Sequence, residues 1–155
     1  MERITIDEVE PDAFGRDVDR RGLSAPLGTS DLAINHYRLD PGERFSGMMH
    51  AHQDQEEVFA VIEGVARFET MDGEVTVEAG EVVRFAPGEY QSGENAGGEE
   101  LVAFALGAPR DSEDVRVPRE CPACGHGNVR VVPADDGDGF GFVCPECGAE
   151  LEAEG

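Results

Sequence analysis

The sequence contains no lysine and no tryptophan among its 155 residues, and aromatic side chains make up only 6% of it. All 12 basic side chains are arginines, against 34 aspartates and glutamates. No basic stripe could displace counterions from phosphates, so nucleic-acid binding is not expected. The longest apolar run, LVAFAL at residues 101–106, is far too short to span a bilayer. The composition therefore indicates an acidic globular protein for which nucleic-acid binding is disfavoured, and it predicts no membrane-spanning segment.

The formal net charge of −22 is spread along the chain, with an acidic excess both before and after residue 110. One interpretation is a partner with a basic surface. The interpretation that we favour is adaptation to a salty cytoplasm, where hydrated carboxylates keep a protein soluble and salt screens their repulsion. The composition resembles that of halophilic proteins, which also avoid lysine. The opening MERITIDEVE has neither the basic start nor the apolar stretch of a signal peptide, and we expect a cytoplasmic protein.

From residue 31 onward the hydrophobic pattern has a period of two. LAINHYRL at 32–39 alternates, and short apolar runs separated by turn sequences follow as far as LVAFALG at 101–107. No segment has a helical period, although ITIDEV at 4–9 could form a strand. This pattern predicts an all-β fold, an antiparallel barrel or jelly roll over residues 1–107. Residues 108–120 carry proline and charge without an apolar pattern, and we interpret them as a linker.

The stretch HAHQDQEEVFAVIEG at residues 50–64 holds the first candidate site. Residues two apart on a strand project from the same face, so His50 and His52 point together. The polar turn that follows would let Glu57 begin the next strand and face both histidines. Two imidazoles and a carboxylate suit a divalent metal inside a barrel mouth. A solvated polar loop is the alternative that the residues alone leave open.

The order of these residues resembles the two signatures of the cupin superfamily. The first signature is matched by His50, His52, Glu57 and Gly64, and the second by Gly80, Gly88 and Asn95. The resemblance covers roughly residues 30–107 and implies a double-stranded β-helix barrel of six to eight strands, usually a homodimer. Relatives in this superfamily include dioxygenases, isomerases, decarboxylases and pure binding modules, so the fold does not select a reaction.

One position departs from the cupin pattern, because Gln91 stands where the second signature usually has a histidine ligand. The barrel metal, which would be Fe, Mn, Ni or Zn, could be held by His50, His52 and Glu57 alone. Alternatively Gln91 could be a weak fourth ligand or could orient a bound water. In a third alternative the metal is lost and the pocket only binds a ligand.

Three further residues could line the cavity, although that is not the first expectation for any of them. His36 is expected to be structural or exposed, although it could face the cavity. One of Met48 and Met49 is expected to pack into the core, with a smaller chance of lining the pocket.

All four cysteines lie in two matching motifs, CPACG at 121–125 and CPECG at 144–148. The C-x₂-C spacing, repeated after 19 intervening residues, predicts a Cys₄ zinc site. A reducing cytosol argues against disulfides. The segment resembles a zinc ribbon, and we expect residues 121–155 to depend on zinc because so short a segment has little core. The ligands are Cys121, Cys124, Cys144 and Cys147.

Two hypotheses for function follow. In the first, the chain is a metal-dependent cupin enzyme that acts on a small molecule by oxygenase or isomerase chemistry, with a structural zinc ribbon. In the second, the barrel binds or senses a small ligand without catalysis, and the ribbon mediates protein contacts. Four thiolates leave zinc no open position, so the ribbon metal is structural in both. We expect the ribbon to dock on the barrel or on a protein partner. A ribbon-led nucleic-acid adaptor is a minor alternative.

Overall fold

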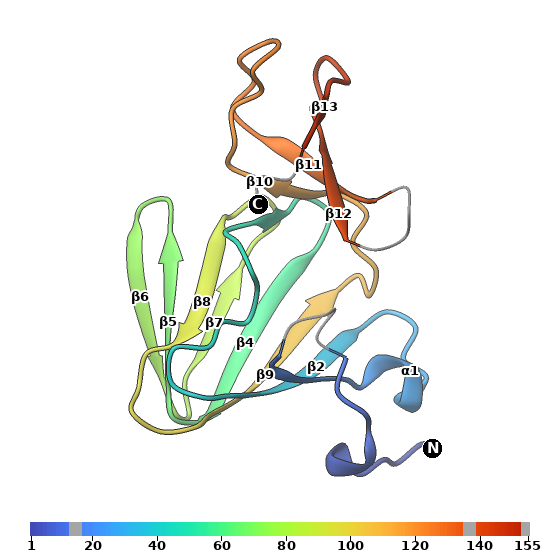
Figure 1. Cartoon of the computed structure of the whole chain (residues 1–155). Helices are drawn as coiled ribbons and strands as arrows, with labels where there is room; N and C mark the ends of the chain where they lie inside the picture. Colours follow the sequence, from blue (N-terminus) through green and yellow to red (C-terminus); the bar gives the residue numbers. More distant parts are fainter. Residues whose placement is uncertain (13–16, 135–138, 153–155) are drawn as a thin grey trace.

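The computed structural model describes residues 1–12, 17–134 and 139–152. Its body is a barrel of two antiparallel sheets that face each other (Figure 1). The first sheet has the order β1-β2-β9-β4-β7. Its strands are β1 (Asp19–Gly22), β2 (Ala33–Leu39), β9 (Leu101–Ala108), β4 (Glu56–Glu63) and β7 (Val82–Phe85).

The second sheet has the order β6-β5-β8 and closes the barrel from the opposite side. Its strands are β6 (Gly73–Glu78), β5 (Val65–Thr70) and β8 (Gln91–Asn95). Inward-facing residues of both sheets alternate with exposed ones, and an aromatic cluster fills the space between them. Phe45, Phe59 and Phe68 form its centre, with ring centroids 4.8–5.6 Å apart. The predicted all-β double-stranded barrel is therefore confirmed.

A third antiparallel sheet, with the order β13-β12-β11-β10-β3, lies over one end of the barrel (Figure 1). Its strands are β13 (Glu150–Leu151), β12 (Phe140–Val143), β11 (Val129–Pro133), β10 (Val115–Val117) and β3 (Ala51–His52). Strand β10 falls within the segment interpreted as a linker, yet it pairs with β3 on one side and β11 on the other. The connection between barrel and ribbon is thus a strand of a continuous sheet.

Helical structure is limited to two short segments, the 3₁₀ helix Ile6–Glu8 and α1 (Ser24–Leu27). The strand expected at residues 4–9 was wrong. The backbone amides of Glu8 and Val9 donate to the carbonyls of Thr5 and Ile6, which are local turn hydrogen bonds and not strand pairing. Within the described part of the chain, no helix is long and apolar enough to cross a membrane.

Two residues of the cupin-like signatures have structural roles. Gly64 adopts a φ of 83°, and a Cβ placed there would lie 2.7 Å from the Glu100 carbonyl oxygen. Glycine is therefore required at the turn between β4 and β5. Asn95 is buried, and its amide nitrogen donates to the carbonyls of Leu39 and Glu99 at 2.8 and 2.7 Å. This amide fixes the loop that follows β8.

A substitution at Gly93 should test the packing of the aromatic core. A Cβ at this position would lie 2.8 Å from Phe45 Cδ2 and closer still to the Phe68 ring. Because both rings are buried and held by neighbouring rings, Gly93→Ala is expected to cost about 1–3 kcal/mol of unfolding free energy. Urea denaturation measures this loss. Gly98→Ala, where a Cβ would meet nothing within 4 Å, is the control and should change stability little.

Candidate functional site

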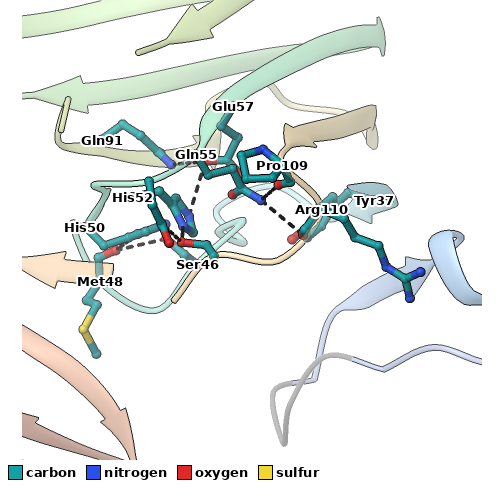
Figure 2. A network of polar contacts seen from close by, with 12 residues as sticks. Tyr37, Ser46, Met48, His50, His52, Gln55, Glu57, Gln91, Pro109 and Arg110 are labelled. Carbon is teal, nitrogen blue, oxygen red and sulfur yellow. Dashed lines mark hydrogen bonds and ion pairs between the residues drawn. The ribbon is translucent and has the colours of Figure 1, made fainter. Parts of the chain in front are cut away.

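The structure brings the two histidines and the glutamate together at the barrel mouth. His50 precedes the short strand β3, His52 ends it, and Glu57 lies near the start of β4. One ligand atom from each residue can be chosen so that all three lie within 4.8 Å of one another. His52 Nε2 is 3.7 Å from Glu57 Oε2, and Figure 2 shows how these side chains lie. The sequence predicted this convergence, whereas the metal role of the three residues stays a prediction.

Hydrogen bonds select one tautomer of each imidazole. His50 Nδ1 lies 3.0 Å from the Met48 carbonyl oxygen, which can only accept, so Nδ1 carries the proton. His52 Nδ1 lies 3.0 Å from the Ser112 hydroxyl oxygen. That hydroxyl donates its own proton to Asp54 Oδ1 at 2.6 Å and therefore accepts from His52. Both rings consequently present an unprotonated Nε2, which is the atom that a metal requires.

Gln91 is adjacent to this cluster and contacts the carboxylate. It is the first residue of β8 and is bridged to His50 by a pair of backbone hydrogen bonds. Its Nε2 donates to Glu57 Oε2 at 3.1 Å. Its buried Oε1 has no hydrogen-bond partner among the described residues. Gln91 thus orients the Glu57 carboxylate through its amide nitrogen, while its amide oxygen has no partner among the described residues.

The electrostatics of the cluster suit a bound cation. Burial raises the pKa of Glu57 from 4.5 to about 7. Burial, with a smaller contribution from His50, lowers the pKa of His52 from 6.5 to about 4, and burial also lowers the pKa of His50. The imidazoles are therefore neutral ligands at pH 7. A divalent cation would supply the positive charge that the buried carboxylate lacks, so these residues fit a metal.

The cluster opens into a cavity of about 640 Å³ between the barrel and the ribbon. This volume is typical of sites for small molecules. Arg20 and Tyr37 contribute polar groups to its wall, with Arg20 Nε donating to the Tyr37 hydroxyl at 3.1 Å. Arg20 is also paired with Asp12 at 2.5 Å. The site therefore combines candidate metal ligands with a cavity large enough for a small molecule.

Sequence reasoning missed the residues that hold His52. Ser112 is 60 positions away from it and lies in the segment interpreted as a linker. Asp54 also accepts a hydrogen bond from the Glu113 backbone amide at 2.7 Å, which ties the segment after β9 to the segment after β3. No sequence motif marks Ser112. Its role depends on the pairing of β10 with β3, which brings distant segments together.

Two expectations about neighbouring residues had different outcomes. The expectation that Met48 or Met49 would be core was wrong, because neither is buried and Met48 is 41% exposed in the cavity wall. Met48 lies two residues before His50, and its carbonyl oxygen accepts a hydrogen bond from His50 Nδ1. His36 is structural, as expected. Its ring is buried edge-on against Phe104 with centroids 5.0 Å apart, and it does not line the cavity.

The four cysteines form a second cluster, distant in sequence from the first. Cys121 Sγ lies 3.8 Å from Cys147 Sγ, and Cys124 Sγ lies 3.5 Å from Cys144 Sγ. Tetrahedral zinc with bonds of about 2.3 Å requires sulfur atoms about 3.8 Å apart. Backbone amides, that of Cys147 foremost, lower the pKa of the Cys144 thiol to about 6, which favours the thiolate. The cluster is compatible with a zinc ribbon, and the zinc itself stays a prediction.

Comparison with known proteins shows a match to one family model and to solved structures of the same fold. The family model described as a cupin domain matches residues 35–107. A sugar phosphate isomerase of the cupin superfamily from Silicibacter pomeroyi is 20% identical, with a TM-score of 0.70 over 98% of each chain. A polyketide cyclase from Streptomyces resistomycificus is 20% identical, with a TM-score of 0.65 over 79% of this chain and 88% of that one. No curated protein matches the sequence.

The fold and the clustered histidines and glutamate define a β-barrel of the double-stranded β-helix class with a candidate metal site in its mouth. Residues 35–107 match the cupin family model, and the barrel has the fold of the solved cupin structure from Silicibacter pomeroyi. The cysteine cluster that follows the barrel is compatible with a zinc ribbon.

Proposed function

We propose that the chain is a metal-dependent cupin enzyme acting on a small molecule bound in the cavity. The observation that supports this most strongly is the fixed tautomer of both imidazoles. Acceptors at Nδ1 leave Nε2 unprotonated on both rings, and each ring has a nitrogen within 4.8 Å of a Glu57 carboxylate oxygen. These three groups would hold Fe, Mn, Ni or Zn as a set of two histidines and one carboxylate, with positions left for substrate.

The residues around the cluster have separable roles. A divalent cation held there would supply Lewis acidity toward a substrate oxygen. Gln91 fixes the orientation of the Glu57 carboxylate, and its Oε1 can accept a hydrogen bond from a bound water or a substrate hydroxyl. Tyr37 places a hydroxyl on the cavity wall, where it can hydrogen-bond to a substrate oxygen. Arg20, which is paired with Asp12, donates to that hydroxyl and orients it.

Among the reactions open to such a site, isomerisation or cyclisation is our first candidate and oxygenation the second. Isomerisation and cyclisation both develop negative charge on a carbonyl oxygen of the substrate. A Lewis acid and a nearby hydrogen-bond donor stabilise that charge. Proteins of similar fold carry the names of a sugar phosphate isomerase and a polyketide cyclase. The chemistry of the donor set supports the proposal, and these names agree with it.

Metal analysis tests the proposal. The purified protein should contain about two metal ions per chain, and His52→Ala should lose one of them, because the imidazole supplies a ligand that no neighbouring residue replaces. His126→Ala, which removes a histidine outside the barrel, is the matched control and should keep both ions. A single tightly held ion that survives His52→Ala would contradict the enzyme and would favour a barrel that only binds its ligand.

Substitutions at Gln91 separate the alternatives for this residue. Gln91→Leu should weaken barrel-metal binding about tenfold, because it removes the hydrogen bond that orients Glu57. Gln91→His should tighten binding by adding a third imidazole. Competition with a chromophoric chelator measures both affinities. If neither substitution changes the affinity, Gln91 has no part in holding the metal.

A further inference from the structure

We infer that the hairpin of β11 and β12 forms one wall of the substrate pocket and selects a ligand with an apolar body. The inference rests on the proposed function, because it takes one end of the ligand to be bound at the barrel metal and states what the hairpin contacts at the other end. Among the residues that the structure describes in this hairpin, four line the cavity and all four are apolar: Val131, Val132, Pro133 and Phe140. The ribbon thus has a role in the site beyond its own stability.

The hairpin is held over the barrel by a continuous ladder of strands. Val115 of β10 pairs with His52 of β3, and Val117 of β10 pairs with Val129 of β11. Two further hydrogen bonds reinforce the junction, from Gln53 N to the Asp114 carbonyl at 2.8 Å and from Arg130 Nη2 to the Glu113 carbonyl at 2.7 Å. The wall is therefore fixed in register with the strand that carries a candidate metal ligand.

Exposed apolar side chains mark the surface that a ligand would cover. Phe140 is 54% exposed and Met48 is 41% exposed, and both line the cavity, one from the ribbon and one from the barrel. Phe142, two residues farther along β12, is buried in the core of the ribbon. Phe140 is therefore not needed to complete that core. In a chain with a net charge of −22, two large apolar groups at the mouth of one cavity indicate contact with an apolar ligand.

The charges around the cavity argue against a phosphorylated ligand. Within its described strands, β11 and β12, the hairpin supplies no basic side chain to the lining. Arg20 is already paired with Asp12. Arg110 donates to the Thr29 carbonyl, and Figure 2 shows its side chain extending away from His50 and His52. The ligand class that fits is a small molecule with an oxygen-chelating end at the His50–His52–Glu57 cluster and an aromatic or branched apolar body against Val132 and Phe140.

Two hydroxamates of different size test this assignment, since each can chelate a divalent metal through two oxygens. Calorimetric titration of the metal-loaded protein should show benzohydroxamate binding about tenfold more tightly than acetohydroxamate, because only its ring reaches the hairpin. In Phe140→Ser this preference should fall to about threefold or less, with acetohydroxamate affinity unchanged. Val132→Ser is a second variant with the same expectation, and zinc content verifies that the ribbon is folded in both.

The control is Val82→Ser, which alters an apolar residue that is 64% exposed and lies outside the cavity. It should keep the full preference for benzohydroxamate. Equal binding of the two probes by the unaltered protein, or a preference that survives in both hairpin variants, would overturn the inference while the barrel metal site stands. If neither probe binds to the loaded protein, the proposed metal function fails and the inference fails with it.

Discussion

Replacing Glu57 with glutamine is expected to stabilise the metal-free protein at pH 8 while abolishing metal binding in the barrel. Burial raises the pKa of this carboxyl from 4.5 to about 7. The folded state therefore binds a proton more tightly than the unfolded state. The stability that this preference contributes is complete below pH 4.5 and is lost as the pH rises through 7. At pH 8 the metal-free protein holds an ionised carboxylate in a site that disfavours it.

The size of the effect follows from the displacement of the pKa. A pKa raised from 4.5 to about 7 corresponds to about 3 kcal/mol lost between the two ends of that pH range. Glutamine keeps the shape and can accept the hydrogen bond that Gln91 donates, but it has no charge to bury. Glu57→Gln should therefore recover much of that energy at pH 8 and gain little at pH 4.5.

Thermal unfolding of protein without a metal in the barrel site, compared between the variant and the unaltered chain at pH 4.5 and pH 8, measures this difference. Glu56→Gln is the matched control, because Glu56 is the exposed neighbour that is paired with Arg84 at 3.4 Å. It removes the same charge from an acidic protein without altering the site. If Glu57→Gln were less stable than the unaltered protein at pH 8, the carboxylate would not be an uncompensated charge, and the account of a site built around a cation would be wrong.

Preventing metal binding at the four cysteines is expected to unfold the segment from Cys121 to the end of the described chain. The core of this segment is small and includes two of the cysteines themselves, Cys121 and Cys144, which are almost fully buried. Without a metal, the four thiols have no cation to bind in common, and the link that a shared ion makes between the two cysteine loops is lost. Metal binding supplies most of the folding free energy in domains of this size. Cys144→Ser should therefore abolish ordered structure in β11 and β12.

Hydrogen exchange followed by mass spectrometry separates this outcome from global unfolding. Amides of β11 and β12 should exchange as fast as in an unfolded peptide, while those of β4 and β9 stay protected, because the aromatic core of the barrel does not depend on the cysteines. Ala123→Ser, a change within the same CPAC loop, is the control and should keep the protection. Protection of the hairpin in Cys144→Ser would show that the segment folds without its metal.

Much of the architecture could be predicted because it is encoded locally. The alternating pattern of residues 32–39 and 101–107 became β2 and β9, which are neighbours in the first sheet. The spacing of His50, His52 and Glu57 brought them to one place because a short strand, a turn and a second strand leave little freedom. The two C-x₂-C motifs likewise form one cluster.

The features that were missed depend on contacts between distant segments. Strand β10 has only three residues and is charged at its centre, so no periodicity marks it, and it exists because β3 and β11 pair with both of its edges. Ser112 acquires its role from that pairing. Similarly, the exposure of Phe140 toward a cavity could not be read from the sequence, because the opposite wall of that cavity belongs to the barrel.

The pairing of β10 with both β3 and β11 has a consequence for how the two candidate metal sites fill. One ladder joins His52 to the hairpin that the cysteines anchor, and Ser112 lies on the path between them. Binding of one cation would order the strands between the two sites. Binding of the second cation would then cost less conformational entropy. Thermodynamic reciprocity then requires that each ion strengthen the hold on the other by the same factor. Loading of the chain with metal would accordingly be cooperative, and half-filled molecules would be scarce.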